Sequence, residues 1–283
     1  TEIISGDAPS LSFEVFPPKT SDKFESVMGA AAEIAKLKPS YMSVTYGAGG
    51  GTSEYTTAIC EALNGFGVTA LAHLTCVSSN RGRIESELEK LRSHGIGNIL
   101  ALRGDIPAGF GRESAHYRHA SELMKEIADF GGFCIGGACY PEGHVEAANK
   151  TEDILHLKEK VEAGCEFLTT QMFFDNNIMY NFLYRIREKG ITVPVIAGIM
   201  PVTNVNQIKR ITSMSGTYLP ERFKAIVDRF GDNPAAMKQA GVIYATEQII
   251  DLIANGVNHI HVYSMNKPEI AAGIQASLSE ILG

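Results

Sequence analysis

Glu14 is the first residue whose type and setting suggest chemistry, because it interrupts the apolar run LSFEVFPPKT (residues 11–20). An unpaired buried charge is costly. On an extended strand, Phe13 and Val15 share one face and Glu14 lies on the other. If the two apolar residues pack under helices, Glu14 points inward, where a dry setting raises the pKa of a carboxyl and makes it a general acid usable near neutral pH. A buried ion pair with a lysine or arginine explains the residue equally well.

Asp105 is a second candidate, in the tripeptide Arg103-Gly104-Asp105. Glycine and aspartate are ordinary turn formers, and Arg103 could pair with the carboxylate, so a structural turn is one interpretation. The other places a fixed negative charge where a cation develops during a reaction. The tripeptide alone does not separate them.

Four glycines between residues 47 and 51 would let the backbone approach a ligand closely. No Gly-Lys-Ser/Thr follows them, so they do not form a Walker loop and are more typical of a flexible loop.

The histidines predict no metal site. His116 and His119, and His259 and His261, lack carboxylates or cysteines at known ligand spacing. His259 and His261 alternate on a predicted strand, and we expect them to be hydrogen-bonded residues of the barrel or its rim. No serine lies in G-x-S-x-G and no cysteine has an adjacent base, so nucleophilic catalysis has no support.

Short β-rich runs alternate with longer helical patterns, and these elements must position the candidate residues. Strands are predicted at 11–16, 41–45, 69–75, 98–102, 134–139, 167–172, 193–198 and 259–263. Helices are predicted at 22–37, 53–66, 81–94, 121–129, 151–163, 177–188, 205–213, 220–230, 234–254 and 268–282.

Eight strands, each followed by a helix, predict an α/β protein with a (β/α)₈ TIM barrel fold and extra helices before the last strand. We expect one catalytic domain over residues 1–283. A doubly wound sheet is the alternative, but its phosphate-binding G-x-G-x-x-G is missing after the first strand. In a barrel the active site lies at the carboxyl ends of the strands, and polar groups stand at almost every predicted strand end.

Composition narrows the function further. A formal charge of −7 without a basic stripe argues against nucleic-acid and anionic-membrane partners. Five scattered cysteines without a C-x-x-C pair indicate reduced thiols in a cytoplasmic protein. We find no signal peptide and no apolar run long enough to span a bilayer.

Eight blocks, one at each strand end, together resemble the methylenetetrahydrofolate reductase family over essentially the whole chain. They read LSFEVFPPKT, SVTYGAGG (43–50), AHLTC (72–76), ALRGDIP (101–107), CYPEGH (139–144), TQMFFD (170–175), AGIMPV (197–202) and VYSMNK (262–267). Because the sequence stops near the end of the barrel, it resembles the short bacterial form without an added regulatory domain.

The resemblance implies a flavoprotein. Members of the family pass hydride from NADH or NADPH to FAD, and then to 5,10-methylenetetrahydrofolate, which becomes 5-methyltetrahydrofolate in a ping-pong reaction on one flavin face. No motif tells NADH from NADPH. Homo-oligomers are common in the family.

By the same resemblance, Glu14 protonates N10 of the folate and opens its five-membered ring to an electrophilic N5 iminium cation. Asp105 stabilises that cation and hydrogen-bonds the pterin. Gln171, Tyr263 and Lys267 match substrate-binding positions, Lys267 near the glutamate tail of the folate.

The positions that match FAD-binding residues of the family extend from the second strand to the fifth helix. They are Thr45, Tyr46, Ala48, His73, Arg103, Gly104, Asp105, Ala120, Tyr140, His144, Ala147, Asp153, His156 and Lys160. Asp153, His156 and Lys160 share one helical face, with Asp153 expected at a ribose hydroxyl and Lys160 at the pyrophosphate.

Some positions depart from the family pattern. Val205 stands in place of a phenylalanine that stacks on the substrate, and His156 and Glu159 in place of an asparagine and an arginine near the phosphates. Lys267 replaces an arginine, giving a point charge instead of a planar fork.

Two other functions stay open. The chain could be a flavin-carrying subunit of a larger electron-transfer complex, inactive alone with NAD(P)H. It could also be a pterin-binding methyl-transfer barrel without flavin.

Overall fold

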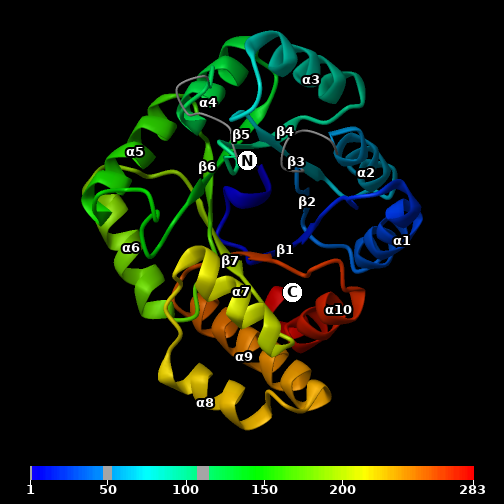
Figure 1. Cartoon of the computed structure of the whole chain (residues 1–283), viewed down its shortest axis with the longest axis vertical. Helices are drawn as coiled ribbons and strands as arrows, with labels where there is room; N and C mark the ends of the chain where they lie inside the picture. The colour runs from blue at the N-terminus through cyan, green and yellow to red at the C-terminus, as the bar shows by residue number, and fades with distance from the viewer. Residues whose placement is uncertain (1, 47–52, 107–114) are drawn as a thin grey trace.

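A computed structural model describes residues 2–46, 53–106 and 115–283, except the side chains of residues 210 and 212–215. Eight parallel strands close into a barrel in sequence order (Figure 1). They are β1 (Ser10–Val15), β2 (Met42–Val44), β3 (Ala70–Thr75), β4 (Asn98–Leu102), β5 (Cys134–Cys139), β6 (Phe167–Thr170), β7 (Val195–Ile199) and β8 (His259–Val262). The predicted (β/α)₈ fold is therefore confirmed.

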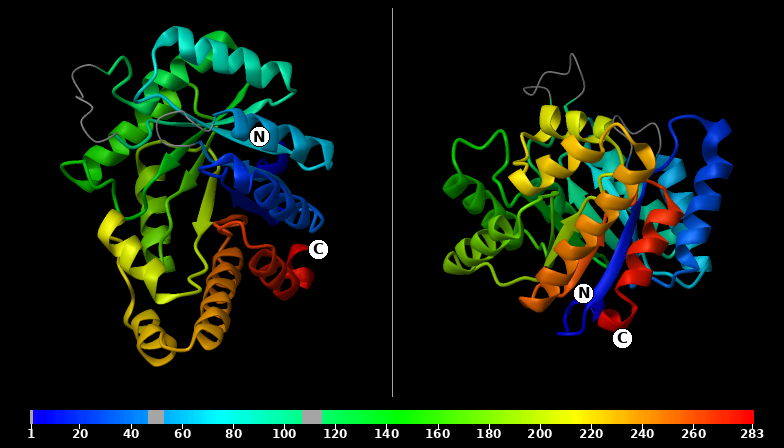
Figure 2. Two further views of the ribbon diagram at one scale, coloured as in Figure 1. Left: turned by 45° about the vertical axis from the view of Figure 1, so that its right-hand side comes forward. Right: turned by 90° about the horizontal axis from the view of Figure 1, so that it is seen from below.

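Helices surround the barrel (Figures 1 and 2). They are α1 (Phe24–Ala35), α2 (Ser53–Gly65), α3 (Arg81–Ser93), α4 (Ala120–Phe130), α5 (Lys150–Glu162), α6 (Asn176–Glu188), α7 (Val205–Ser215), α8 (Glu221–Phe230), α9 (Pro234–Ala254), α10 (Pro268–Ser277) and α11 (Ser279–Leu282), with 3₁₀ turns η1 (Glu2–Ile4) and η2 (Ser21–Lys23). As predicted, extra helices precede the last strand, and α8 packs on α9 at the outer edge of the molecule. The single-domain assignment stays a prediction.

Local sequence explains where the helices begin. Asn80, Asn149, Asp175 and Asn233 each precede a helix, and their side-chain oxygens accept backbone N–H groups of the first turn. Such caps satisfy donors that a helix cannot pair internally. The longest helix, α9, also has Pro234 at its start, where proline's fixed φ is already helical.

Strands β1, β2, β6 and β8 end one or two residues earlier than predicted, and in β1 and β6 a side chain pairs with the backbone beyond the strand end. β1 stops at Val15, and the N–H of Phe16 donates instead to Oδ1 of Asn266. β6 stops at Thr170, and the N–H of Met172 donates to Oε1 of Gln171. The predicted last helix is also divided, at Leu278, into α10 and α11.

Three apolar clusters leave one end of the barrel polar. The main core lies between strands and helices and contains fully buried Phe13 and Val15. A small cluster that includes Ile4 and Phe167 fills the amino end of the barrel, and a third lies under α7–α9, where Phe174 stacks on Phe223. The carboxyl ends of β2–β5 are thus left for polar groups.

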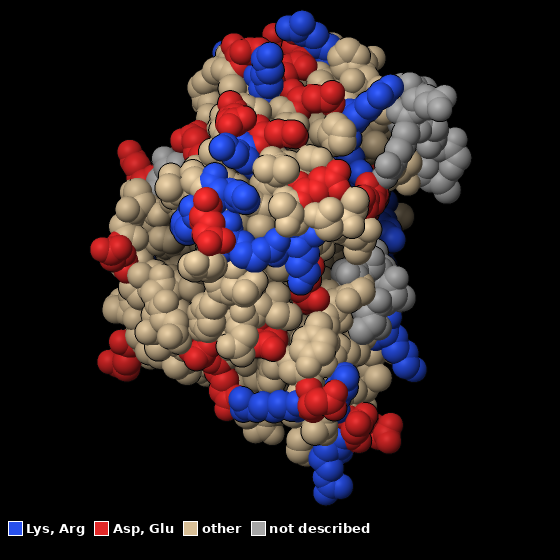
Figure 3. Space-filling view, turned by 90° about the vertical axis from the view of Figure 1, so that its left-hand side faces the viewer, with Lys and Arg blue, Asp and Glu red and all other residues tan. Residues whose placement is uncertain are grey.

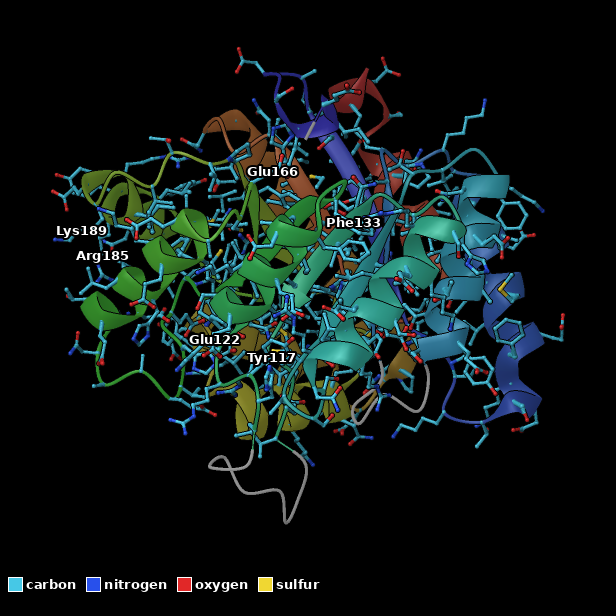
Figure 4. All side chains as sticks on the ribbon, turned by 90° about the horizontal axis from the view of Figure 1, so that it is seen from above. Tyr117, Glu122, Phe133, Glu166, Arg185 and Lys189 are labelled. Atoms are coloured by element: carbon cyan, nitrogen blue, oxygen red, sulfur yellow. The ribbon has the colours of Figure 1, made fainter. Side chains whose placement is uncertain are left out.

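Figure 4 shows residues at the amino and carboxyl ends of the barrel. Phe133 and Glu166, which precede β5 and β6, lie at the amino end, whereas Tyr117 and Glu122, which flank the start of α4, lie at the carboxyl end. On the outer face in Figure 3, acidic and basic side chains are interspersed among uncharged ones. No helix within the described ranges has the length and apolar character needed to cross a membrane.

Candidate active site at the carboxyl end of the barrel

A cavity of about 730 Å³ lies at the carboxyl ends of β2–β5 and extends over one face of α5. Every predicted FAD position that the structure describes lines it: Thr45, Tyr46, His73, Arg103, Gly104, Asp105, Ala120, Tyr140, His144, Ala147, Asp153, His156 and Lys160. Ala48 and the glycine cluster lie outside the described residues. The fold thus brings together positions that are far apart in the sequence.

Glu14 lies at the edge of this cavity, against His73. Its side chain is 19% exposed, and its Oε2 is 3.6 Å from Nε2 of His73. Burial raises the pKa of Glu14 to about 8 and lowers the pKa of His73 to about 4. The distance would suit an ion pair, but at a pH between about 4 and about 8 the carboxyl and the imidazole are both uncharged. Among the described residues no lysine or arginine forms an ion pair with Glu14, so the alternative of a buried Lys or Arg pair finds no partner within those residues.

The inward face predicted for Glu14 is borne out by Ser12, two residues earlier. Its Oγ lies 2.8 Å from Nδ1 of His261 and donates to the carbonyl of Ile260. Because that hydroxyl has one proton, Ser12 accepts from Nδ1–H, and Nε2 of His261 accepts from Ser43, 2.9 Å away. Burial lowers the pKa of His261 to about 3, consistent with a neutral ring.

His259 is likewise held by Ser10, whose Oγ lies 2.9 Å from its Nδ1. Both strand histidines are therefore hydrogen-bonded residues of the barrel, as predicted. Within the described ranges, no group of three or more His, Cys, Asp or Glu residues is arranged to hold a metal ion.

His73 differs from these histidines. Its Nε2 is buried and has no hydrogen-bond partner among the described residues, and its side chain lines the cavity. A buried polar atom without a partner costs free energy, and a ligand with a polar edge would remove that cost. The residue fits the wall of a site for a flat heterocycle such as a flavin.

Asp105 stands exposed at the cavity rim, presented by Gly104. Gly104 has φ +86°, and a Cβ there would lie 2.9 Å from Cβ of Thr75, so the turn requires glycine. Arg103 forms a two-point ion pair with Glu146, at 2.5 Å and 3.0 Å, and not the suggested pair with Asp105. Asp105 is therefore not held by its neighbouring arginine.

The α5 face predicted from the resemblance borders the cavity. Nζ of Lys160 donates to the carbonyl of Ala138 at 2.7 Å, and burial lowers the pKa of this lysine. Oδ2 of Asp153 accepts the backbone N–H of His144 at 3.2 Å. His156 is exposed at the rim. A cation and hydrogen-bonding groups on one wall suit the phosphates and ribose of a dinucleotide.

The predicted folate-binding residues lie outside this cavity, at the ends of β6 and β8. The hydroxyl of Tyr263 donates to the carbonyl of Thr170 at 2.6 Å, and Nζ of Lys267 donates to Oγ1 of Thr203 at 3.1 Å. Gln171 accepts the N–H of Met172. The candidate site thus has two parts, the cavity over β2–β5 and a polar group from β1, β6 and β8 that contains Glu14. Val205 begins α7, near Gly231.

Sequence reasoning missed several lining residues, among them Arg118, His119 and Glu146. His119 caps α4, and Oε2 of Glu122 accepts its N–H at 2.9 Å. A capping box is a signal that the sequence carries, although with histidine in place of the usual serine or threonine. Glu146 had no such signal, because only the fold brings it to Arg103.

Comparison with known proteins identifies relatives over nearly the whole chain. The sequence profile of the family described as Methylenetetrahydrofolate reductase matches residues 1–279. The chain is 35% identical over 266 residues to the 5,10-methylenetetrahydrofolate reductase of Escherichia coli (strain K12), covering 94% of this chain and 89% of that protein.

Longer plant proteins also match. The chain is 34% identical over 289 residues to Methylenetetrahydrofolate reductase (NADH) 1 of Zea mays, covering 96% of this chain but 48% of the plant protein. The chain therefore spans about half the length of these plant relatives.

Among solved structures, a protein from Clostridium thermocellum that binds two copies of 5-methyl-5,6,7,8-tetrahydrofolic acid has a TM-score of 0.66. It is 17% identical, and the match covers 99% of this chain and 97% of that one. At this identity the likeness shows a shared fold.

Proposed function

The chain belongs to the methylenetetrahydrofolate reductase family, and from this premise we propose that it reduces 5,10-methylenetetrahydrofolate to 5-methyltetrahydrofolate with FAD and NADH or NADPH. The observation that carries the proposal is the largely buried Glu14 carboxyl beside the cavity, whose pKa burial raises to about 8. A reductase of this kind needs a proton donor next to a site for a redox cofactor.

The cavity residues fit FAD. His73 offers a polar atom that has no hydrogen-bond partner among the described residues, and Gly104 leaves room for the turn that presents Asp105. Lys160 and Asp153 would hold the pyrophosphate and a ribose hydroxyl. When bound, FAD supplies the hydride chemistry, taking hydride from the nicotinamide and giving it to the folate in turn.

Glu14 supplies the proton of the folate half-reaction. Its carboxyl donates a proton to N10 of methylenetetrahydrofolate, the bond between N10 and the bridging carbon breaks, and a cationic N5 iminium forms that accepts hydride. A neutral acid is required for this step, and the burial of Glu14 keeps it neutral at physiological pH.

Charge and orientation complete the site. The carboxylate of Asp105 would stabilise the iminium cation and hydrogen-bond the pterin. Gln171 and Tyr263 would orient the pterin, and Lys267, in the segment after β8, would meet the glutamate tail. We propose the cytoplasm as the location and a homo-oligomer as the assembled form.

Anaerobic stopped-flow absorbance tests the function. The isolated chain, purified yellow or reconstituted with FAD, is mixed separately with NADH, with NADPH and, after reduction, with methylenetetrahydrofolate. We expect bleaching by a nicotinamide and recovery of colour with the folate. Bleaching only by an artificial donor would favour a subunit of a larger complex, and failure to bind FAD would favour a flavin-free pterin barrel.

A further inference from the structure

Side chains of the loop after β8 form hydrogen bonds with the end of β1, next to Glu14. Backbone pairing between these strands runs from Ser10 opposite His259 to Phe13 opposite Val262 and stops there. On its other side β1 stays paired with β2 through Glu14 and Val15. The segment that carries Glu14 therefore has a backbone ladder on one side only.

Side chains replace the ladder on the β8 side. Oγ of Ser264 donates to the carbonyl of Glu14 at 2.9 Å. The carboxamide of Asn266 accepts from the N–H of Phe16 and donates to its carbonyl, both at 2.9 Å. One asparagine thus makes the two hydrogen bonds that a peptide group of a neighbouring strand would make. After Phe16 come two prolines, which have no N–H to continue the sheet.

Two residues of this loop have a strained, left-handed backbone conformation. Met265 and Asn266 have φ of 56° and 55°. Among the described residues only Lys38 shares this conformation outside glycine. A residue with a side chain is strained in the left-handed conformation, and persists there where its surroundings fix it. Here the conformation turns the carboxamide of Asn266 onto Phe16.

We infer that Asn266, assisted by Ser264, is a positioning residue that holds the end of β1 so that the Glu14 carboxyl stays aimed into the barrel mouth. The inference rests on the proposed role of Glu14 as the acid. Without the hydrogen bonds from Asn266 and Ser264, residues 14–16 would be paired with β2 alone. The Glu14 carboxyl would then reach bulk water and lose its alignment with the folate. Misplacing a reacting group by about 1 Å can cost on the order of 100-fold in rate.

The titratable groups that face Glu14 come from β3 and from the segments before β2 and after β8. His73 of β3 is 3.6 Å away, and Tyr41 before β2 and Tyr263 after β8 interact with its charge. Burial raises the pKa of both tyrosines and lowers that of His73, so all three are neutral at physiological pH. A change in the titration of Glu14 then reports its own position rather than a neighbour's charge.

Asn266→Gly is the decisive variant, because glycine accepts φ 55° without strain. The substitution therefore removes only the two side-chain hydrogen bonds to Phe16. In the FAD-loaded enzyme we expect the folate half-reaction to slow by about 10- to 100-fold, while reduction by nicotinamide is unchanged. Lys38→Gly is the matched control, since Lys38 is exposed, has the same left-handed backbone and lies outside the site. It should change neither half-reaction.

A second readout is independent of turnover. With glutamate labelled at Cδ, ¹³C NMR follows the titration of Glu14, which Glu14→Gln assigns by removing its signal. We expect a midpoint near 8 in the parent protein, as burial dictates, and a lower midpoint in Asn266→Gly. A purely structural role would lower the melting temperature and leave the midpoint and the ratio of the half-reactions unchanged, which would overturn the inference.

The outcomes separate the inference from the proposed function. If Glu14→Gln keeps full folate reduction, the proposed role of Glu14 is wrong. If Glu14→Gln loses it while Asn266→Gly keeps both rate and titration, only the inference is wrong. If Asn266→Gly does not fold, Ser264→Ala decides, since it removes the single bond to the Glu14 carbonyl and should give a smaller loss in the same direction.

Discussion

Oε2 of Glu14 lies 3.6 Å from Nε2 of His73, and the two groups meet as a neutral acid and a neutral imidazole. Burial alone accounts for this, because it raises the pKa of the carboxyl to about 8 and lowers that of the ring to about 4. An ion pair would have lowered the carboxyl pKa and removed the proton that the proposed reaction needs. The pairing with histidine instead of lysine or arginine thus keeps Glu14 usable as an acid.

Glu14→Gln is expected to spare reduction of the flavin by nicotinamide and nearly abolish reduction of the folate, because glutamine keeps the shape but donates no proton. The loss should be on the order of 100- to 10,000-fold, as for other general acids. Anaerobic stopped-flow absorbance measures the two half-reactions separately. Equal survival of both would rule Glu14 out as the acid.

The stability of the protein should depend on pH through the same carboxyl. The folded pKa of Glu14, about 8, lies above its ordinary value of 4.5, so the folded state holds a proton that the unfolded state has lost between these values. Its contribution to stability therefore falls as pH rises across that window, by about 1.4 kcal/mol per pH unit at most. His73 has the opposite sign, since its folded pKa lies below 6.5, and its contribution rises between about 4 and 6.5.

Urea denaturation of the parent and Glu14→Gln at several pH values isolates the Glu14 contribution, because His73 titrates in both proteins. The difference in unfolding free energy should shift in favour of the variant from pH 4.5 to 8. A constant difference would mean that Glu14 is not buried as an acid.

The elements were predictable because each carries a local signal. Hydrophobic periodicity and helix-capping residues are read within a few residues of sequence, and β4 and β5 have the predicted bounds. The inward face of Glu14 followed from strand alternation alone, given buried Phe13 and Val15.

What the sequence did not reveal are contacts between distant residues. Asn266 forms hydrogen bonds with Phe16, which is 250 residues away in the sequence, and Arg103 pairs with Glu146, which is 43 residues away. Neither contact leaves a pattern in the sequence around its residues. The suggested pairing of Arg103 with Asp105 was wrong, because Arg103 pairs with the distant Glu146. The cavity-facing side of α5 is a different case. Its charged residues read as a solvated face by composition, and only the resemblance marked it as a site.

Gly104→Ala should destabilise the protein and weaken the cavity wall, because alanine at φ +86° is strained and its Cβ would collide with Thr75. Gly190→Ala is the matched control, with φ +77° and open space around its Cβ. The backbone cost, about 1–2 kcal/mol, is common to both. Urea denaturation should show the larger loss in Gly104→Ala, and equal losses would mean that the Thr75 contact is easily relieved.

Lys160→Met is expected to weaken FAD retention by about 10- to 100-fold, the value of one hydrogen bond to a charged group. Release of flavin fluorescence on dilution measures the affinity. Lys158→Met is the control, because Lys158 is exposed on α5 and does not line the cavity. If both variants bind FAD equally, the charge of Lys160 does not face the cofactor.

Asp105→Asn should slow the folate half-reaction more than reduction of the flavin, because the iminium cation forms only with the folate. Loss of the negative charge is expected to cost on the order of 10- to 100-fold in that half-reaction. Asp129→Asn makes the same charge change at an exposed position on the last turn of α4, away from the cavity, and should leave both half-reactions unchanged. Stopped-flow rates at one ionic strength compare the three proteins. A larger effect on flavin reduction in Asp105→Asn would show that its carboxylate acts on the cofactor and not on the cation.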